Sequence, residues 1–312
     1  MGLFFQLLEQ MGFIATLIFI GFCAVRLGFL SSKDVDGLSK LLLKVILPFL
    51  VITVVTSAGT REEFFSAAPF ILCILLMYAI LGLVGFVSAK LLGYTPPKSN
   101  VHINSCMFVN SALLGYPIIM ALFPEESGIA IAAFMLTETV VTWTAGILIL
   151  TYGQDGSGIR LKNMVTPATI ALVLALLLIL ADIKPSGLLW DTFTGIGNCN
   201  KYLGLIFIGA DMGRRGFQNI AADKKVLFVS PCKLVIGPIL VFLVLSATNL
   251  VSPTFVLIAT LFSMLPSMMI TTILAQQYDT APDYATAALL STTVFSLITI
   301  PAVFWVITEI LM

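Results

Sequence analysis

The sequence is poor in charge. Charged residues make up only 10% of the 312 positions while hydrophobic residues make up 59%, whereas soluble domains carry roughly a quarter charged residues. Lys and Arg together number 16, and so do Asp and Glu, so no excess of either sign predicts a nucleic-acid partner or a polybasic membrane tether. This composition excludes an ordinary soluble domain and predicts a multi-pass protein of the inner or plasma membrane.

Motifs for catalysis and metal binding are also lacking. His102 is the only histidine, and the five cysteines are scattered without a CxxC pair, which argues against a zinc site or a disulfide framework. The sequence contains no HExxH, no GxSxG and no paired Asp motif, so it does not predict an enzyme. We expect no cofactor. His102 is expected at the cytoplasmic start of a span, in contact with solvent.

Long hydrophobic runs are abundant. A helix needs about 20 mostly apolar residues to cross a bilayer, and ten runs fit that need, at about 10–30, 37–57, 65–89, 101–122, 128–150, 164–182, 199–213, 226–247, 254–276 and 283–308. The seventh is short. The segment GLLWDTFTGIGNCN before it is typical of an interfacial or partly inserted stretch, and Asn198 and Asn200 are expected to cap the helix or to line a cavity.

Basic residues predict the orientation of these spans. Thirteen Lys and Arg residues fall on one set of alternate loops and helix ends, Lys233 among them, against three on the other set, Arg61, Lys184 and Lys201. Because cytoplasmic loops carry the excess of Lys and Arg, both termini are predicted to face away from the cytoplasm. Asp211 is expected to pair with Arg214 and Arg215 at a helix end.

The chain shows a weak internal repeat. LTETVV at 136–141 matches LSTTVF at 290–295 with an offset of 154 residues. We interpret 1–150 as one five-helix repeat, 151–163 as a short cytoplasmic linker, and 164–312 as a second repeat. An odd number of spans inverts the second repeat relative to the first, as in many secondary transporters. The predicted fold is all-α, with ten transmembrane helices in two inverted five-helix repeats.

Two of these spans contain helix-breaking residues near their centres. NSALLGYP lies in the fourth span and LPSMMITT in the ninth, its counterpart in the repeat. A single Pro is more often a plain kink, since membrane helices tolerate it. Two breaks in repeat-related spans instead predict unwound segments that offer backbone amides to an anion. The predicted substrate-binding residues are Asn110, Ser111, Gly115, Tyr116, Pro117, Pro266, Ser267, Thr271 and Thr272.

Glu138 lies inside the fifth span. A carboxylate within a membrane is costly and often marks an ion pathway, so Glu138 is a candidate for proton or ion coupling. The alternative is a protonated, hydrogen-bonded structural residue. Its counterpart in the repeat is Thr292.

The motifs resemble the auxin efflux carrier family. The resemblance rests on NSALLGYP, on AAFMLTETVV and on the tail from LPSMMITTILAQQY to LSTTVFSLITIPAVFWVI. It implies a ten-helix fold in which broken helices four and nine cross near the middle of the membrane and bind organic anions, such as auxin in plants or malonate and malate in bacteria. Asn110, Gly115 and Pro117 match the first crossing segment, and Pro266 matches the second.

The second crossing segment departs from the family. Met268, Met269 and Ile270 stand where bacterial relatives place an Asn, and Thr271 stands where plant carriers have a second Pro. The long cytoplasmic loop of the plant carriers is also missing.

The function predicted from the sequence is secondary transport of small organic anions such as carboxylates by alternating access. A membrane receptor or sensor is the alternative, and an intramembrane enzyme is a weaker one. The expected partners are the anion and the lipid bilayer. The coupling ion, proton or sodium, is left open, and so is a homodimer.

Overall fold

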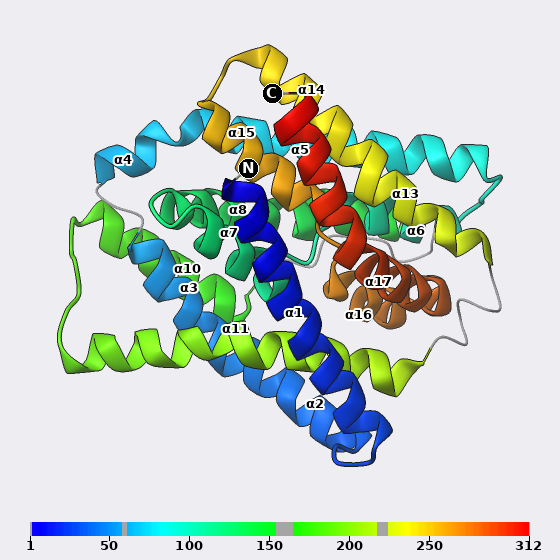
Figure 1. Ribbon diagram of the computed structural model, residues 1–312, viewed down its shortest axis with the longest axis horizontal. Coiled ribbons are helices and arrows are strands. Elements are labelled where there is room, and N and C mark those ends of the chain that lie inside the picture. The colour runs from blue at the N-terminus through cyan, green and yellow to red at the C-terminus, as the bar shows by residue number, and fades with distance from the viewer. Residues whose placement is uncertain (1, 58–60, 154–164, 217–223, 312) are drawn as a thin grey trace.

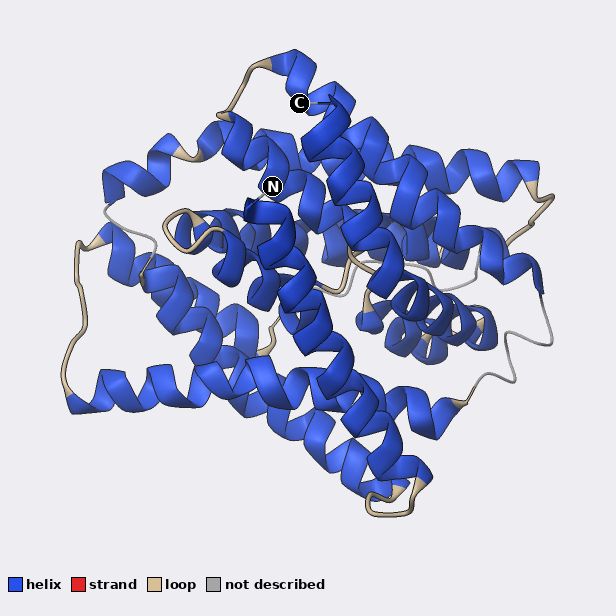
Figure 2. Cartoon of the chain, in the orientation of Figure 1, coloured by secondary structure: helices blue, strands red, loops and turns tan. Residues whose placement is uncertain are grey.

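The computed structural model describes residues 2–57, 61–153, 165–216 and 224–311. In this part of the chain every regular element is a helix, as Figure 2 shows, and the only β-type pairing recorded is an isolated bridge between Val109 and Ser267. The expectation of an all-helical protein is therefore confirmed.

Six helical segments among the described residues are long and apolar enough to cross a membrane. Two are single helices, α1 (Gly2–Arg26) and α5 (Ala68–Leu91). The other four contain short π or 3-10 turns. The first combines α2 (Ser32–Leu41), η1 (Leu42–Ile46) and α3 (Leu47–Thr56), and the second combines α8 (Ser127–Val141), η3 (Thr142–Gly146) and α9 (Ile147–Leu150). The third combines η5 (Lys224–Phe228), α13 (Val229–Pro231), η6 (Cys232–Ile236) and α14 (Gly237–Thr248), and the fourth combines α17 (Pro282–Val306) with η7 (Ile307–Leu311). A short helix, α4 (Arg61–Ser66), precedes α5.

The other four expected spans do not meet the same criterion. Two of them are broken, one into α6 (Lys98–Met107), η2 (Ser111–Gly115) and α7 (Tyr116–Leu122), the other into α15 (Pro253–Met264) and α16 (Met269–Gln277). The remaining two are α10 (Pro167–Leu180), which has 14 residues, and α11 (Leu188–Arg215), which has 28. The count of ten spans and their inverted repetition therefore stay predictions.

Helix α11 corrects one expectation. GLLWDTFTGIGNCN is not a separate interfacial stretch, because the helix begins at Leu188 and continues through it to Arg215. Asn198 and Asn200 consequently lie inside the helix and do not cap it. The polar residues of this stretch made the helix hard to recognise in the sequence. In the structure one of them, Asn200, is buried and donates a hydrogen bond to Ala112 of η2.

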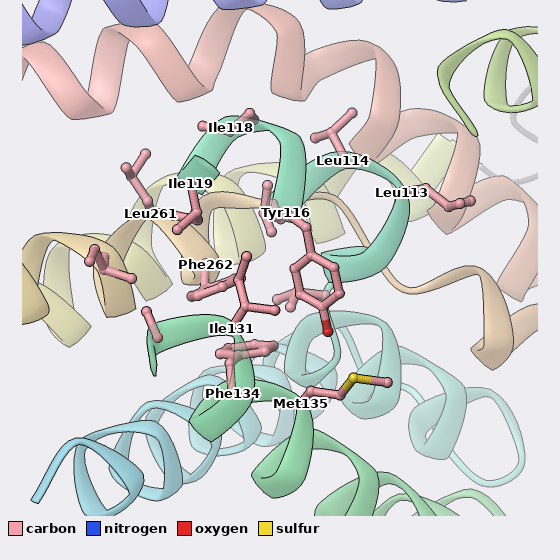
Figure 3. Close-up of a cluster of buried hydrophobic side chains, with 14 of the residues drawn as sticks. Leu113, Leu114, Tyr116, Ile118, Ile119, Ile131, Phe134, Met135, Leu261 and Phe262 are labelled. Carbon is pink, nitrogen blue, oxygen red and sulfur yellow. The ribbon is translucent and has the colours of Figure 1, made fainter. Parts of the chain in front are cut away.

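The helices pack as two interlocked groups, each drawn from both halves of the sequence. Helix α11 packs against α1 and α3, and α10 packs against α3; Figure 1 shows α11 running across the lower part of the view beneath α1. In the second group α5 contacts α6, α8, α14 and α15, while α17 contacts α6 and α16. Large apolar side chains fill the space between elements. Figure 3 shows part of this core around Phe134 and Phe262, whose rings stack 3.7 Å apart.

Glycine allows α1 and α11 to touch through their backbones. A Cβ atom on Gly209 of α11 would lie 1.8 Å from the carbonyl oxygen of Ile18, and one on Gly21 of α1 would lie 1.9 Å from that of Ile206. Small residues permit such close approach in membrane helices, where packing replaces the hydrophobic effect as the driving force. These two positions therefore require glycine.

We expect Gly209→Ala to destabilise the protein by about 1–3 kcal/mol, because the added methyl forces the two backbones apart. The melting temperature of the purified protein in detergent, followed by intrinsic fluorescence, measures the effect. Gly12→Ala on α1 is the matched control, since nothing lies within 4 Å of its added Cβ. Equal melting temperatures for the two variants would show that the helices separate without cost.

Candidate functional site

The two helix breaks meet and pair with each other. The segment between α6 and η2 is extended at Phe108, and the segment between α15 and α16 is extended at Leu265 and Met268. The Asn110 amide donates to the Pro266 carbonyl over 2.8 Å, and the Met268 amide donates to the Phe108 carbonyl over 3.2 Å. These bonds enclose the antiparallel bridge between Val109 and Ser267. Backbone groups freed by one break are thus satisfied by the other.

A serine beside each break is held by the long helix that follows that break in sequence. The Ser111 hydroxyl donates to Glu138 Oε2 over 2.6 Å. The Ser267 amide donates to the Thr292 hydroxyl over 3.1 Å, while the Ser267 hydroxyl donates to the Ser105 carbonyl over 2.7 Å. Glu138 and Thr292 are the residues that the sequence repeat pairs. Similar positions in α8 and α17 therefore anchor the two breaks, one through a carboxylate and the other through a hydroxyl.

A cavity of about 120 Å³ lies beside the crossing. We name it the central cavity. It is large enough for several water molecules. Its walls come from η1 and α3, both breaks and the helices that follow them, α8 and η3, and the start of α10. The lining residues are Leu43, Leu47, Asn110, Ser111, Ala112, Leu113, Tyr116, Met135, Glu138, Thr139, Thr142, Trp143, Thr166, Ala168, Thr169, Met268, Met269, Ile270 and Ile273.

Two polar groups of this wall are not engaged by the protein. Among the residues that the structure describes, no hydrogen-bond partner is recorded for the side-chain amide of Asn110. The Thr142 hydroxyl is buried and also has no partner there. Because buried polar groups are normally hydrogen-bonded, this pair indicates a place that water or a ligand occupies.

Two helix N-termini open on the same cavity. The helical segment Ser111–Leu122 contributes Ser111, Ala112 and Leu113 to the wall, and α16 contributes Met269 and Ile270. The first amides of a helix have no partner within it, and the helix dipole makes this end positive. The Ser111 amide donates to the Val109 carbonyl. The remaining N-terminal amides, the Asn110 side chain and the Thr142 hydroxyl form a set that suits a small anion.

Only some of the residues predicted to bind substrate line the central cavity. Asn110, Ser111 and Tyr116 line the central cavity together with Glu138. Gly115 does not line it; it packs against the second break, where an added Cβ would lie 2.5 Å from Leu265 Cδ1. Pro117 lines a different cavity.

The predicted residues of the second break mostly act through backbone contacts. Pro266 supplies the carbonyl that accepts from Asn110, and Ser267 is buried in the hydrogen bonds described above. Thr271 and Thr272 are buried, and the Thr272 hydroxyl bonds within its own helix to Met269. The residues that the second break and α16 contribute to the cavity wall are instead apolar: Met268, Met269, Ile270 and Ile273.

His102 was expected to contact solvent, and this is wrong. It is fully buried, with Nε2 lying 2.7 Å from the Ser88 hydroxyl and Nδ1 lying 2.6 Å from the Tyr284 hydroxyl. The two hydroxyls satisfy both ring nitrogens, which allows a histidine to be buried in an apolar core. The expected pairing of Asp211 with Arg214 and Arg215 is confirmed.

Lys233 does not belong with the loop residues that indicate orientation. It is completely buried in η6, and its ammonium has no hydrogen-bond partner among the described residues. An unpaired buried charge is costly, and no ion pair joins Lys233 to a carboxylate among the described residues.

Other cavity residues were missed by reasoning from the sequence. Thr139, Thr142, Thr166 and Thr169 line the central cavity. Tyr78 of α5 donates to Glu138 Oε1 over 3.4 Å. The only signal for the first two was the cluster TETVVTWT, and nothing in the sequence brings Tyr78 or the start of α10 to Glu138. No group of three or more His, Cys, Asp or Glu suited to a metal is found in the described ranges.

Comparisons with known proteins match the chain over most of its length. A family model described as "Membrane transport protein" matches residues 6–305. A protein of Methanothermobacter thermautotrophicus named "Uncharacterized transporter" is 24% identical over 293 residues, covering 92% of this chain and 94% of that protein. One of Rhizobium meliloti named "Putative malonate transporter" is 22% identical over 303 residues, covering 93% and 92%.

We expect Thr292→Val to loosen the second break. The substitution keeps the shape of the side chain and removes the acceptor of the Ser267 amide, and a buried donor without a partner costs about 1–3 kcal/mol. Thr293→Val is the matched control, because the Thr293 hydroxyl donates only within its own helix, to Leu289. Thermal unfolding in detergent should show a larger loss for Thr292→Val. Equal losses would mean that the break does not depend on Thr292.

Proposed function

Because the chain belongs to the membrane transport protein family, we propose that it is a secondary transporter of small organic anions that binds its substrate in the central cavity. The family and the names of its relatives indicate a multi-pass membrane transporter rather than an enzyme. The substrate class, the site and the mechanism are our proposal.

One observation carries the choice of an anion. The side-chain amide of Asn110, which has no hydrogen-bond partner among the described residues, lies on the same cavity wall as the N-terminal residues of the segment Ser111–Leu122 and of α16. Carboxylate oxygens accept hydrogen bonds from amides and hydroxyls, which this wall offers through Asn110, Thr142 and the backbone. The apolar side chains of Met268, Met269 and Ile270 then face the carbon skeleton of the substrate. A short carboxylate fits these two surfaces.

Glu138 couples binding of the substrate anion to uptake of a proton. A substrate carboxylate in the central cavity lies on the same wall as the Glu138 carboxylate, and two like charges this close repel each other in a poorly solvated site. Protonation of Glu138 removes that repulsion. We therefore propose that substrate and proton are taken up together, and that Ser111 and Tyr78 hold Glu138 through hydrogen bonds when it is charged.

The paired breaks support transport by alternating access. Ser111 and Ser267 are anchored by residues that the sequence repeat relates, Glu138 and Thr292, which supports two inverted five-helix repeats around the crossing. In such carriers one group of helices moves against the other around a fixed site. The central cavity lies where η1, α3 and α10 meet the crossing, so we place the moving interface there. We also propose, from the distribution of Lys and Arg, that both termini are on the non-cytoplasmic side.

Malonate is the first substrate to test, because one relative carries it in its name. The assay measures uptake of labelled malonate, with acetate and succinate for comparison, into proteoliposomes with an imposed pH gradient or membrane potential. Saturable flux of one of these anions supports the proposal. Absence of flux for all three from protein that is folded by its melting curve would refute it.

Asn110→Ala should reduce malonate transport at least about tenfold, since one good hydrogen bond to a charged group is worth about 1.5–3 kcal/mol. Abundance in the membrane should not change, because no other contact of this side chain is recorded in the described part of the chain. Asn100→Ala is the control, as Asn100 bonds to Leu150 and Tyr152 away from the cavity. Wild-type flux in Asn110→Ala would remove Asn110 from the site.

Glu138→Gln should make transport independent of pH. In the wild-type protein, flux should rise as the solution on the substrate side becomes more acidic, because Glu138 must take up a proton for the anion to bind. Glutamine keeps the hydrogen-bonding shape and cannot titrate. The measurement is initial malonate uptake from pH 5 to pH 8 without a membrane potential. If the variant keeps the slope of the wild type, Glu138 is structural.

A further inference from the structure

A second cavity lies next to the central cavity. Its volume is about 290 Å³, and we name it the outer cavity. Its walls come from α3, α7 and the first half of α11, namely Leu50, Tyr116, Pro117, Met120, Ala121, Gly197, Asn198, Asn200, Lys201 and Tyr202. Of the described residues, Tyr116 is the one that lines both cavities.

Tyr116 is positioned as a partition. The ring is 2% exposed and lies edge-on to Phe262 with a centroid distance of 6.4 Å. Figure 3 shows the ring descending from its helix toward Met135, with the hydroxyl at the far end. Met135 lines only the central cavity, so the ring extends from one cavity wall toward the other. Tyr116 therefore lies between the two spaces.

The outer cavity carries a positive charge. The Lys201 ammonium lies 4.8 Å from the ring centroid of Phe13 and 6.0 Å from that of Tyr202, contacts that orient a cation without neutralising it. No carboxylate is recorded within ion-pair distance of Lys201 in the described ranges. The charge is therefore free to attract an anion.

An unpaired polar atom lies in the same cavity wall. Asn200 is 1% exposed, and its amide nitrogen donates to the Ala112 carbonyl over 2.8 Å. Its Oδ1 is buried and has no partner among the described residues. Since such atoms are normally satisfied, Oδ1 is an acceptor that a hydrogen-bond donor entering this wall would pair. An anion that is drawn to Lys201 and brings a bound water meets both needs.

We propose that the outer cavity is a separate binding station for the substrate anion, in which Lys201 attracts the carboxylate, Asn198 and Asn200 contribute hydrogen-bonding groups, and Tyr116 closes the way to Asn110. This inference rests on the proposed function. It also uses the expected orientation, in which Lys201 is on the non-cytoplasmic side. An anion entering from outside is held at Lys201 until Tyr116 moves.

The first test measures uptake of labelled malonate from the outside of right-side-out vesicles. Lys201→Gln should raise the KM about tenfold, the equivalent of roughly 1.4 kcal/mol of lost binding, and leave the maximal rate within about twofold, the pattern of a lost binding interaction. Lys201→Arg should restore the KM. Lys184→Gln is the matched control, because Lys184 is expected on the same side and lines neither cavity.

The second test needs no transport. Met120→Cys and Thr139→Cys report on the outer and the central cavity, in a background in which the exposed Cys199 is replaced by serine. Membrane-impermeant anionic and cationic thiosulfonates are added from outside. Met120→Cys should react faster with the anionic reagent, and Lys201→Gln should lower the ratio of anionic to cationic rates about tenfold. Thr139→Cys should not react from this side while Tyr116 is intact, and it should react when Tyr116 is also changed to Ala. Tyr116→Phe keeps the ring, so Thr139→Cys should stay unreactive in that background.

The outcomes separate the two proposals. An unchanged KM and an unchanged rate ratio in Lys201→Gln overturn the outer station while leaving anion transport in place. Labelling of Thr139→Cys from outside with Tyr116 intact overturns the partition. If the rate ratio changes as expected but the wild-type protein transports no anion, the charged cavity stands, and both the proposed function and the station's role in transport fail.

Discussion

The structure depends on one constraint: backbone groups that leave a helix inside a membrane must find a partner. Asn110 and Met268 donate across the crossing to Pro266 and Phe108, so each break supplies what the other lacks. Neither break could exist alone at this depth without exposing peptide groups to lipid. This mutual pairing fixes where α6, η2, α15 and α16 end or begin, and thereby fixes the central cavity.

The chemistry of the site follows from that pairing. The helices that restart after the breaks place their first residues in the wall of the central cavity, and α8 and α17 hold the serines beside the breaks. On one side the anchor is the carboxylate of Glu138, which also accepts from Tyr78; on the other side it is the hydroxyl of Thr292. The two breaks are therefore anchored at corresponding positions by groups of different chemistry, of which only the carboxylate can carry a charge.

Local sequence predicted the elements better than it predicted the contacts. Proline and glycine within apolar runs identified both breaks, and an isolated carboxylate in a span identified Glu138. Burial of polar residues was harder, because it depends on partners distant in sequence: both ring nitrogens of His102 are satisfied by Ser88 and Tyr284, and the Asn200 amide nitrogen donates to the Ala112 carbonyl. The length of α11 was also underestimated, since its polar first half resembles a loop until the packing against α3 is known. Lys233 was grouped with loop lysines because hydropathy does not reveal which way a side chain points.

The contact at Gly21 and Gly209 has a mechanical consequence. Backbones that touch cannot slide past each other without a collision at every turn, so α1 and α11 form a stiff frame. The interface beside the central cavity is different, because long, unbranched side chains such as Met268 and Met269 fill it, and methionine adapts its shape at little cost. The α1–α11 pair therefore resists displacement, whereas the methionine-lined wall of the central cavity can change its shape.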